Sequence, residues 1–150
     1  MINGLIKANS ILSLIESIEK ILVYHGTDND FDQFDYNKIG STTDDGMLGK
    51  GFYFSTDKNI ARSNKIRIAV ELTIKNPLLL YAHEWTINKK KLITEKIGIS
   101  LNSTSSKITK VLKDKGYDSV ILNYKHLHYF HKEIVVFDLK QIKVKSKDLL

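Results

Sequence analysis

Three apolar, strand-like runs lie far apart in this sequence, and each carries one polar side chain. The first run ends at His25, the second contains Tyr53, and the third begins at Glu133. Glycines adjoin the first two runs at Gly26, Gly49 and Gly51. A glycine beside a strand permits another molecule to approach the backbone closely, and a buried carboxylate needs partners. The three runs therefore predict strands that meet at one built site.

The length of 150 residues fits one domain, residues 1–150, that buries a core without cross-links. The absence of cysteine excludes disulfides and thiolate zinc sites and favours a reducing, cytoplasmic location. Apolar residues near the N-terminus alternate with charged ones, as in an amphipathic helix and unlike a signal peptide. No apolar run approaches the roughly 20 residues of a membrane span, so we expect no membrane partner.

Turn formers and apolar periodicity divide the chain into an N-terminal helix, residues 1–20, and a core, residues 21–145. We expect strands at 21–25, 51–54, 67–74, 78–80, 119–122, 133–137 and 141–144, and helices at 9–20, 57–64, 85–97 and 104–115. This order lacks the strict βαβ alternation of a Rossmann fold, which indicates an α+β fold. Residues 37–50 form a long polar loop, a length that is often functional inside a small domain.

The net charge of +6 is unevenly distributed along the chain. Residues 1–75 carry 9 basic and 10 acidic side chains, whereas residues 76–150 carry 14 basic and 7 acidic ones. A positive half can attract nucleic acid, an acidic protein or a phosphorylated ligand. However, 21 of the 23 cations are lysine, and arginine is the usual residue for bidentate recognition of phosphate or guanine. A merely solvated lysine-rich face is therefore the alternative.

Two common kinds of site are disfavoured by the spacing of glycines and histidines. The glycines at 46, 49 and 51 fit neither the dinucleotide fingerprint nor the P-loop, and they precede a strand instead of following one. Within the expected loop 124–132, alternate histidines at 126 and 128 could share a metal ion. No third ligand is evident, so we predict no metal site and expect this loop to contact substrate or solvent.

Taken singly, His25 and Tyr53 are typical of core residues and Glu133 of a strand-end glutamate in water. Taken together and in order, the three strings resemble the motifs of the His-Tyr-Glu group of ADP-ribosyltransferases, the diphtheria-toxin and poly(ADP-ribose) polymerase type. The strings are Tyr24-His25-Gly26-Thr27, Gly49-Lys50-Gly51-Phe52-Tyr53-Phe54-Ser55 and Lys132-Glu133-Ile134-Val135-Val136-Phe137-Asp138. The resemblance spans about residues 21–145 and implies a split β-sandwich core with flanking helices.

The resemblance implies an NAD-dependent mono-ADP-ribosyltransferase, with NAD as a substrate whose nicotinamide–ribose bond is cleaved. It assigns catalysis to His25, Tyr53 and Glu133. His25 would hold the adenosine-side ribose, Tyr53 would stack on nicotinamide, and Glu133 would accept a hydrogen bond from the 2′-hydroxyl of the nicotinamide ribose. The implied NAD-binding residues are His25, Gly26, Thr27, Tyr53 and Ser55, with the Gly26 backbone holding the nicotinamide amide.

The resemblance also implies functions for two loops. The sequence departs from the family pattern at two places. Loop 37–50 would lie over NAD, and loop 124–132 would face the acceptor. Many relatives carry a second aromatic about a dozen residues after the tyrosine, but residues 61–65 contain none. Position 131, two before the glutamate, is histidine, whereas arginine-modifying relatives carry glutamate there. An arginine acceptor is therefore disfavoured.

Two alternatives stay open beside the transferase. One is an NAD glycohydrolase on the same fold, in which water is the acceptor. The other is a non-catalytic domain that binds nucleic acid or protein through its basic half. For the transferase we expect an unidentified protein or nucleic-acid acceptor and a cognate inhibitor or antitoxin as partners. A toxin-like bacterial or phage protein, cytoplasmic or delivered into a target cell, is the expected setting.

Overall fold

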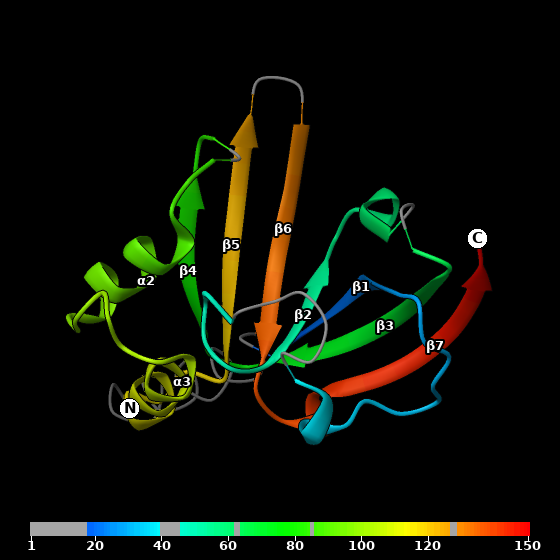
Figure 1. The fold of residues 1–150 in the computed structure, drawn as a ribbon, viewed down its shortest axis with the longest axis horizontal. Coiled ribbons are helices and arrows are strands. Elements are labelled where there is room, and N and C mark those ends of the chain that lie inside the picture. Colours follow the sequence, from blue (N-terminus) through cyan, green and yellow to red (C-terminus); the bar gives the residue numbers. More distant parts are fainter. Residues whose placement is uncertain (1–17, 40–45, 62–63, 85, 127–128) are drawn as a thin grey trace, which may run out of the picture.

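The computed structural model describes residues 18–39, 46–61, 64–84, 86–126 and 129–150. Within these residues the strands form one seven-stranded sheet in the order β4-β5-β6-β2-β1-β3-β7 (Figure 1). The strands are β1 (Glu19–Thr27), β2 (Phe52–Ser55), β3 (Ile66–Ile74), β4 (Pro77–Ala82), β5 (Ser119–His126), β6 (Tyr129–Val136) and β7 (Ile142–Leu149). The helices are α2 (Lys89–Ile97), α3 (Ser105–Asp114) and the short 3₁₀ turns η1 (Tyr36–Lys38), η2 (Lys58–Ala61) and η3 (Leu139–Gln141).

The short strand β2 joins two halves of the sheet. On one side it pairs with β6 from Phe52 to Ser55, and on the other it pairs with β1 where Ser55 lies opposite Tyr24. The half made of β4, β5 and β6 and the half made of β1, β3 and β7 splay apart from this joint (Figure 1). β4 and β5 run parallel, and the remaining pairs are antiparallel. This arrangement agrees with the α+β prediction.

Each half has its own apolar core. The helices α2 and α3 cover the β4-β5-β6 half, where Ile93 and Ile108 are fully buried against strand residues such as Leu122 (Figure 1). The other half buries the alternating apolar residues of β3 with Val23 of β1. Phe31 and Phe34, from the segment after β1, pack on this second core. Burial of such side chains stabilises a fold by about 1.5–3 kcal/mol each.

Capping side chains define the two α-helices. The Thr104 side chain accepts a hydrogen bond from the Lys107 backbone N–H and starts α3 as predicted. Gly116, at φ +91°, follows α3 and donates its N–H to the Lys113 carbonyl, as expected for a glycine after a helix. The predicted start of α2 at residue 85 is wrong, because Asn88 caps that helix through the Lys91 N–H. Residue 85 itself lies outside the described residues.

Two predicted boundaries near the ends of the first strand and helix need correction. Glu19 and Lys20, expected at the end of the first helix, belong to β1 and pair with Ile74 and Thr73. The rest of that predicted helix, residues 9–17, lies outside the described residues. The helix expected at 57–64 is the 3₁₀ turn η2 in its described part.

The predicted loop 124–132 is a β-hairpin in its described part. The ladder continues through the pairs Tyr124–His131 and Lys125–Phe130, so β5 is longer than expected and β6 starts earlier. The stacked cross-strand pair of Tyr124 and His131 stabilises this ladder, although the polar residues of the segment are typical of a loop. β7 is likewise longer than 141–144, because it pairs with β3 as far as Leu149. None of the described helices is long and apolar enough to cross a membrane.

Candidate active site

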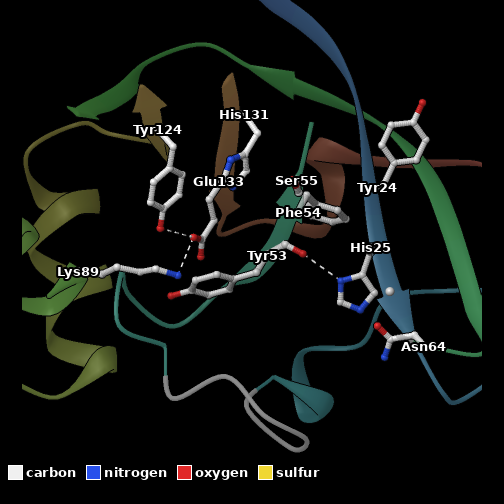
Figure 2. Close-up of a pocket in the computed structure, with 11 residues that line it drawn as sticks. Tyr24, His25, Tyr53, Phe54, Ser55, Asn64, Lys89, Tyr124, His131 and Glu133 are labelled. Carbon is white, nitrogen blue, oxygen red and sulfur yellow. Dashed lines mark hydrogen bonds and ion pairs between the residues drawn. The ribbon is translucent and has the colours of Figure 1, made fainter. Parts of the chain in front are cut away.

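The three residues singled out from the sequence line one pocket at the joint between the two halves (Figure 2). The pocket holds about 340 Å³, within the roughly 300–1,000 Å³ of small-molecule sites. Its lining residues are Tyr24, His25, Gly26, Tyr53, Phe54, Ser55, Asn64, Lys89, Tyr124, His131 and Glu133. Strands β1, β2 and β6 therefore bring His25, Tyr53 and Glu133 to one cavity, although 28 and 80 residues separate them in sequence.

His25 is held as a neutral, directed hydrogen-bonding group. Its Nδ1 lies 2.9 Å from the Tyr53 carbonyl oxygen, and because a carbonyl can only accept, Nδ1 carries the proton. Burial lowers the pKa of His25, and the hydrogen bond to the Tyr53 carbonyl only partly offsets this. The rings of Phe34 and Phe54 pack edge-on against the imidazole, with ring centroids 5.3 and 5.8 Å from its centroid. The neutral ring therefore presents Nε2 as a hydrogen-bond acceptor.

Tyr53 is fixed by its hydroxyl, which leaves its half-buried ring at the pocket wall. The hydroxyl donates to the Gly49 carbonyl at 2.6 Å and accepts from the Leu48 N–H at 3.0 Å. Helix α3 holds the same segment, residues 48–50, because Thr109 Oγ1 donates to the Lys50 carbonyl at 2.9 Å. The segment ahead of β2 is thus tied to the helical cover, and these bonds fix the position of the Tyr53 side chain in the pocket lining.

Glu133 lies in the middle of β6. The sequence-based prediction that it stands at a strand end is therefore wrong. Its carboxylate is largely shielded, with 16% of the side chain exposed. Lys89 Nζ lies 2.7 Å from Oε2, and the Tyr124 hydroxyl donates to the same oxygen at 3.3 Å (Figure 2). A cation and a phenol thus both contact one oxygen of this shielded carboxylate, as a buried polar group requires.

A protein-family model described as ADP-ribosyltransferase in polyvalent proteins matches residues 19–148. The chain belongs to this family. No curated protein matches the chain. Enzymes of this kind transfer ADP-ribose from NAD, so the family supports ADP-ribosyl transfer with NAD as the donor and a second molecule as the acceptor. The sequence resemblance is thereby confirmed at the level of the family.

The glycines of the central string serve the packing of this ADP-ribosyltransferase domain and not the approach of a ligand. A Cβ on Gly51 would lie 2.6 Å from the Val136 carbonyl oxygen of the neighbouring strand. A Cβ on Gly49, where φ is +110°, would lie 2.8 Å from Thr109 Oγ1. Neither glycine lines the pocket. The expectation of close approach by another molecule is thus wrong here, because the chain itself occupies that space.

The remaining residues of the predicted NAD contact set divide into two groups. Gly26 and Ser55 line the pocket of the transferase domain, and Ser55 lies opposite Glu133 in the β2–β6 ladder. Thr27 is absent from the pocket lining. Its hydroxyl instead closes a local turn, accepting from the Asn29 N–H at 3.1 Å. Residues 40–45 of the loop expected to cover NAD lie outside the described residues.

Sequence reasoning missed Lys89 as a site residue and gave Tyr124 no place in the site. Burial lowers the pKa of Lys89, but Glu133 and then Tyr124 more than offset this, so the pKa is raised overall. Burial, and next Glu133, raise the pKa of Tyr124. Lys89 is the first of three consecutive lysines, and nothing in their side chains distinguishes one from the next. Only the position at the start of α2 selects it.

His131 belongs to this part of the site. Its ring stacks on Tyr124 with centroids 4.5 Å apart and planes 7° apart. Burial lowers the pKa of His131, an effect that Asp57 opposes. Of the other histidines proposed as a cluster, position 128 lies outside the described residues. Among the residues that the structure describes, no group of three or more potential ligands could hold a metal ion.

Proposed function

We propose that this domain is an NAD-dependent mono-ADP-ribosyltransferase of the His-Tyr-Glu type. The observation that supports this most is the convergence of His25, Tyr53 and Glu133 on one pocket from three strands. A dinucleotide bound there would meet a neutral imidazole, an aromatic face and a carboxylate. These are the groups that ribose, nicotinamide and a cationic sugar require.

In the proposed reaction the bond between the nicotinamide nitrogen and C1′ of the ribose breaks, and its electron pair stays on nicotinamide. The ribose becomes oxocarbenium-like, as in glycoside cleavage. Glu133 accepts a hydrogen bond from the 2′-hydroxyl and stabilises the positive charge through its own negative charge. A nucleophile on the acceptor then forms the new bond to C1′ and releases its proton to solvent.

The other side chains bind and orient NAD. Nε2 of His25 accepts a hydrogen bond from a hydroxyl of the adenosine-side ribose. The Tyr53 ring stacks on nicotinamide, since its hydroxyl is already engaged by Leu48 and Gly49. The backbone of Gly26 holds the nicotinamide amide, and Ser55 completes the contacts. Thr27 belongs to this set through its backbone, because its hydroxyl closes the turn with Asn29.

For the acceptor we propose a protein or nucleic acid that approaches on the β5–β6 hairpin side of Glu133. A cognate inhibitor or antitoxin would compete on the same side.

For the fold we propose that the two splayed halves of the sheet are the two parts of a split β-sandwich (Figure 1). For the location we propose a cytoplasmic site of action, reached directly or by delivery into a target cell.

The experiment incubates the purified protein with NAD labelled in its adenosine part, together with candidate proteins and nucleic acids. We expect release of nicotinamide and label on a macromolecule, with both lost in Glu133→Ala. Glu95→Ala removes an exposed glutamate from α2 and serves as the matched control. A wild type that neither binds NAD nor releases nicotinamide refutes the proposal. Free ADP-ribose without labelled macromolecule would replace it by the glycohydrolase.

A further inference from the structure

Lys89 is a charged pocket residue to which the proposed reaction gives no task. Among the described residues that line the pocket, it is the lone lysine or arginine. Its side chain is 28% exposed, and its ammonium lies 2.7 Å from the Glu133 carboxylate. The helix start directs it inward, whereas Lys91, two residues on, is exposed. A half-buried ion pair inside a pocket costs desolvation, so its presence needs a reason.

The contacts to Glu133 are unequally divided between its two oxygens. Lys89 Nζ and the Tyr124 hydroxyl both bind Oε2. No hydrogen bond from a described residue reaches Oε1. One oxygen is thus held by α2 and β5, two elements on the same side of the carboxylate, and the other remains for a ligand (Figure 2).

We propose that Lys89 is a positioning residue for Glu133: together with Tyr124 it holds Oε2 so that Oε1 is presented to the 2′-hydroxyl of the nicotinamide ribose. This inference rests on the proposed function, because it takes NAD as the ligand of Oε1. Lys89 itself touches neither nicotinamide nor ribose in this arrangement, and it acts through the carboxylate.

Two effects of the ammonium oppose each other. Lys89 orders a flexible glutamate side chain before NAD binds, which favours the reaction. Its positive charge also repels the cationic sugar. Orientation is the larger effect, because a misplacement of about 1 Å can cost about 100-fold in rate. The ammonium lies on the oxygen remote from the ribose and is partly exposed, so solvent screens the repulsion.

The surroundings of Glu133 contain further titratable groups from each neighbouring element. These are Tyr124 from β5, His131 from β6 and Tyr53 from β2. The His131 ring stacks on the Tyr124 ring, with centroids 4.5 Å apart. Compared with these groups, Lys89 is the stronger electrostatic partner of Glu133, because it carries a full charge and makes the shortest contact to the carboxylate, at 2.7 Å.

The kinetic experiment measures nicotinamide release by the wild type, Lys89→Met, Lys89→Arg and the control Lys91→Met. We expect Lys89→Met to lower kcat about 10- to 100-fold, with little change in KM for NAD. Lys89→Arg should recover part of kcat, since it restores a cation, and Lys91→Met should match the wild type. An unchanged or higher kcat in Lys89→Met, or an equal loss in Lys91→Met, overturns the proposal.

A second experiment tests the pairing without relying on turnover. The ¹³Cε resonances of labelled lysines are titrated in the wild type and in Glu133→Gln. We expect the pKa of Lys89 to fall in the variant, because burial lowers it and Glu133 supplies the main opposing effect. The resonance of Lys91 should not respond.

The two experiments separate two kinds of failure. A wild type that turns over NAD but shows no response of Lys89 to Glu133→Gln overturns the positioning role alone. A wild type that shows the response but releases no nicotinamide overturns the proposed function, and the role of Oε1 with it. The pairing of Lys89 with Glu133 would survive that second outcome.

Discussion

The two halves of the sheet hold their site residues by different physical means. In the β1-β3-β7 half, His25 is neutral, is surrounded by aromatic edges and donates to a backbone carbonyl. In the β4-β5-β6 half, Glu133 is charged and is held by an ammonium and a phenol. Under the proposed function, the neutral His25 would serve recognition of NAD, whereas Glu133 would serve the step in which positive charge develops. Binding and bond breaking should therefore be separable by mutation.

The largest expected effect comes from removing the charge in the second half. Glu133→Gln keeps the size of the side chain but loses its negative charge. We expect kcat for nicotinamide release to fall by about 100- to 1,000-fold, with NAD binding nearly retained. Steady-state kinetics combined with calorimetric titration of NAD separates the two quantities. A loss confined to NAD affinity would contradict the division between the halves.

The joint between the halves should be sensitive to one methyl group. Gly51→Ala would place a Cβ 2.6 Å from the Val136 carbonyl oxygen, a rigid backbone atom. We expect the free energy of unfolding to fall by about 2–3 kcal/mol, measured by urea denaturation. Gly98→Ala is the control. Gly98, unlike Gly51, has a left-handed backbone at φ +74°, but no atom lies within 4 Å of its Cβ. Its cost should therefore come from the backbone alone and stay at about 1 kcal/mol. Equal costs would argue against the steric reason.

Two substitutions at His25 divide the functions of its two ring nitrogens. His25→Asn keeps a donor near the Nδ1 position, for the Tyr53 carbonyl, and removes Nε2. His25→Gln places its amide near the Nε2 position and loses the donor at Nδ1. We expect His25→Asn to raise KM for NAD about tenfold, the equivalent of one lost hydrogen bond, with kcat little changed. A larger effect on kcat than on KM would show that His25 takes part in bond breaking.

The smallest expected effect is a pH dependence of stability. Burial lowers the pKa of His25 in the folded state, so the unfolded state binds the proton first. The free energy of unfolding should therefore decrease as pH falls below about 6.5, the unperturbed histidine value, until the folded pKa is passed. His25→Asn should flatten this slope, and His83→Asn, at an exposed position, should leave it unchanged. Urea denaturation between pH 5 and 8 measures it, and an unchanged slope in His25→Asn would contradict the burial argument.

The parts of the fold that were predictable are those specified by local chemistry. Helix α3 starts after its threonine cap and ends two residues before Gly116, because hydrogen bonds within a few residues decide both ends. The three strings with His25, Tyr53 and Glu133 were readable because each puts a polar residue in or beside an apolar strand. Their convergence on one pocket was expected from three polar residues in separate apolar runs, and the family resemblance then assigned each a role.

The parts that escaped prediction depend on contacts between distant segments. Lys89 becomes a site residue only because α2 starts beside β6, and three consecutive lysines look alike in sequence. The hairpin at 124–132 depends on pairing across the ladder, as between Tyr124 and His131, and polar residues concealed it. The role of Gly51 depends on the carbonyl of Val136, 85 positions away. In each case the deciding partner is far along the chain.

The four-residue length of β2 has a consequence for how this domain can vary. β2 touches β1 at the Tyr24–Ser55 pair and spans the distance to β6 with four consecutive pairs. Adding or deleting one residue there would rotate Tyr53 onto the opposite face, since side chains alternate along a strand. Insertions and deletions should therefore stay out of β2. The shortest strand of the sheet thus fixes the spacing between His25 on β1 and Glu133 on β6, the two side chains that lie on its neighbouring strands.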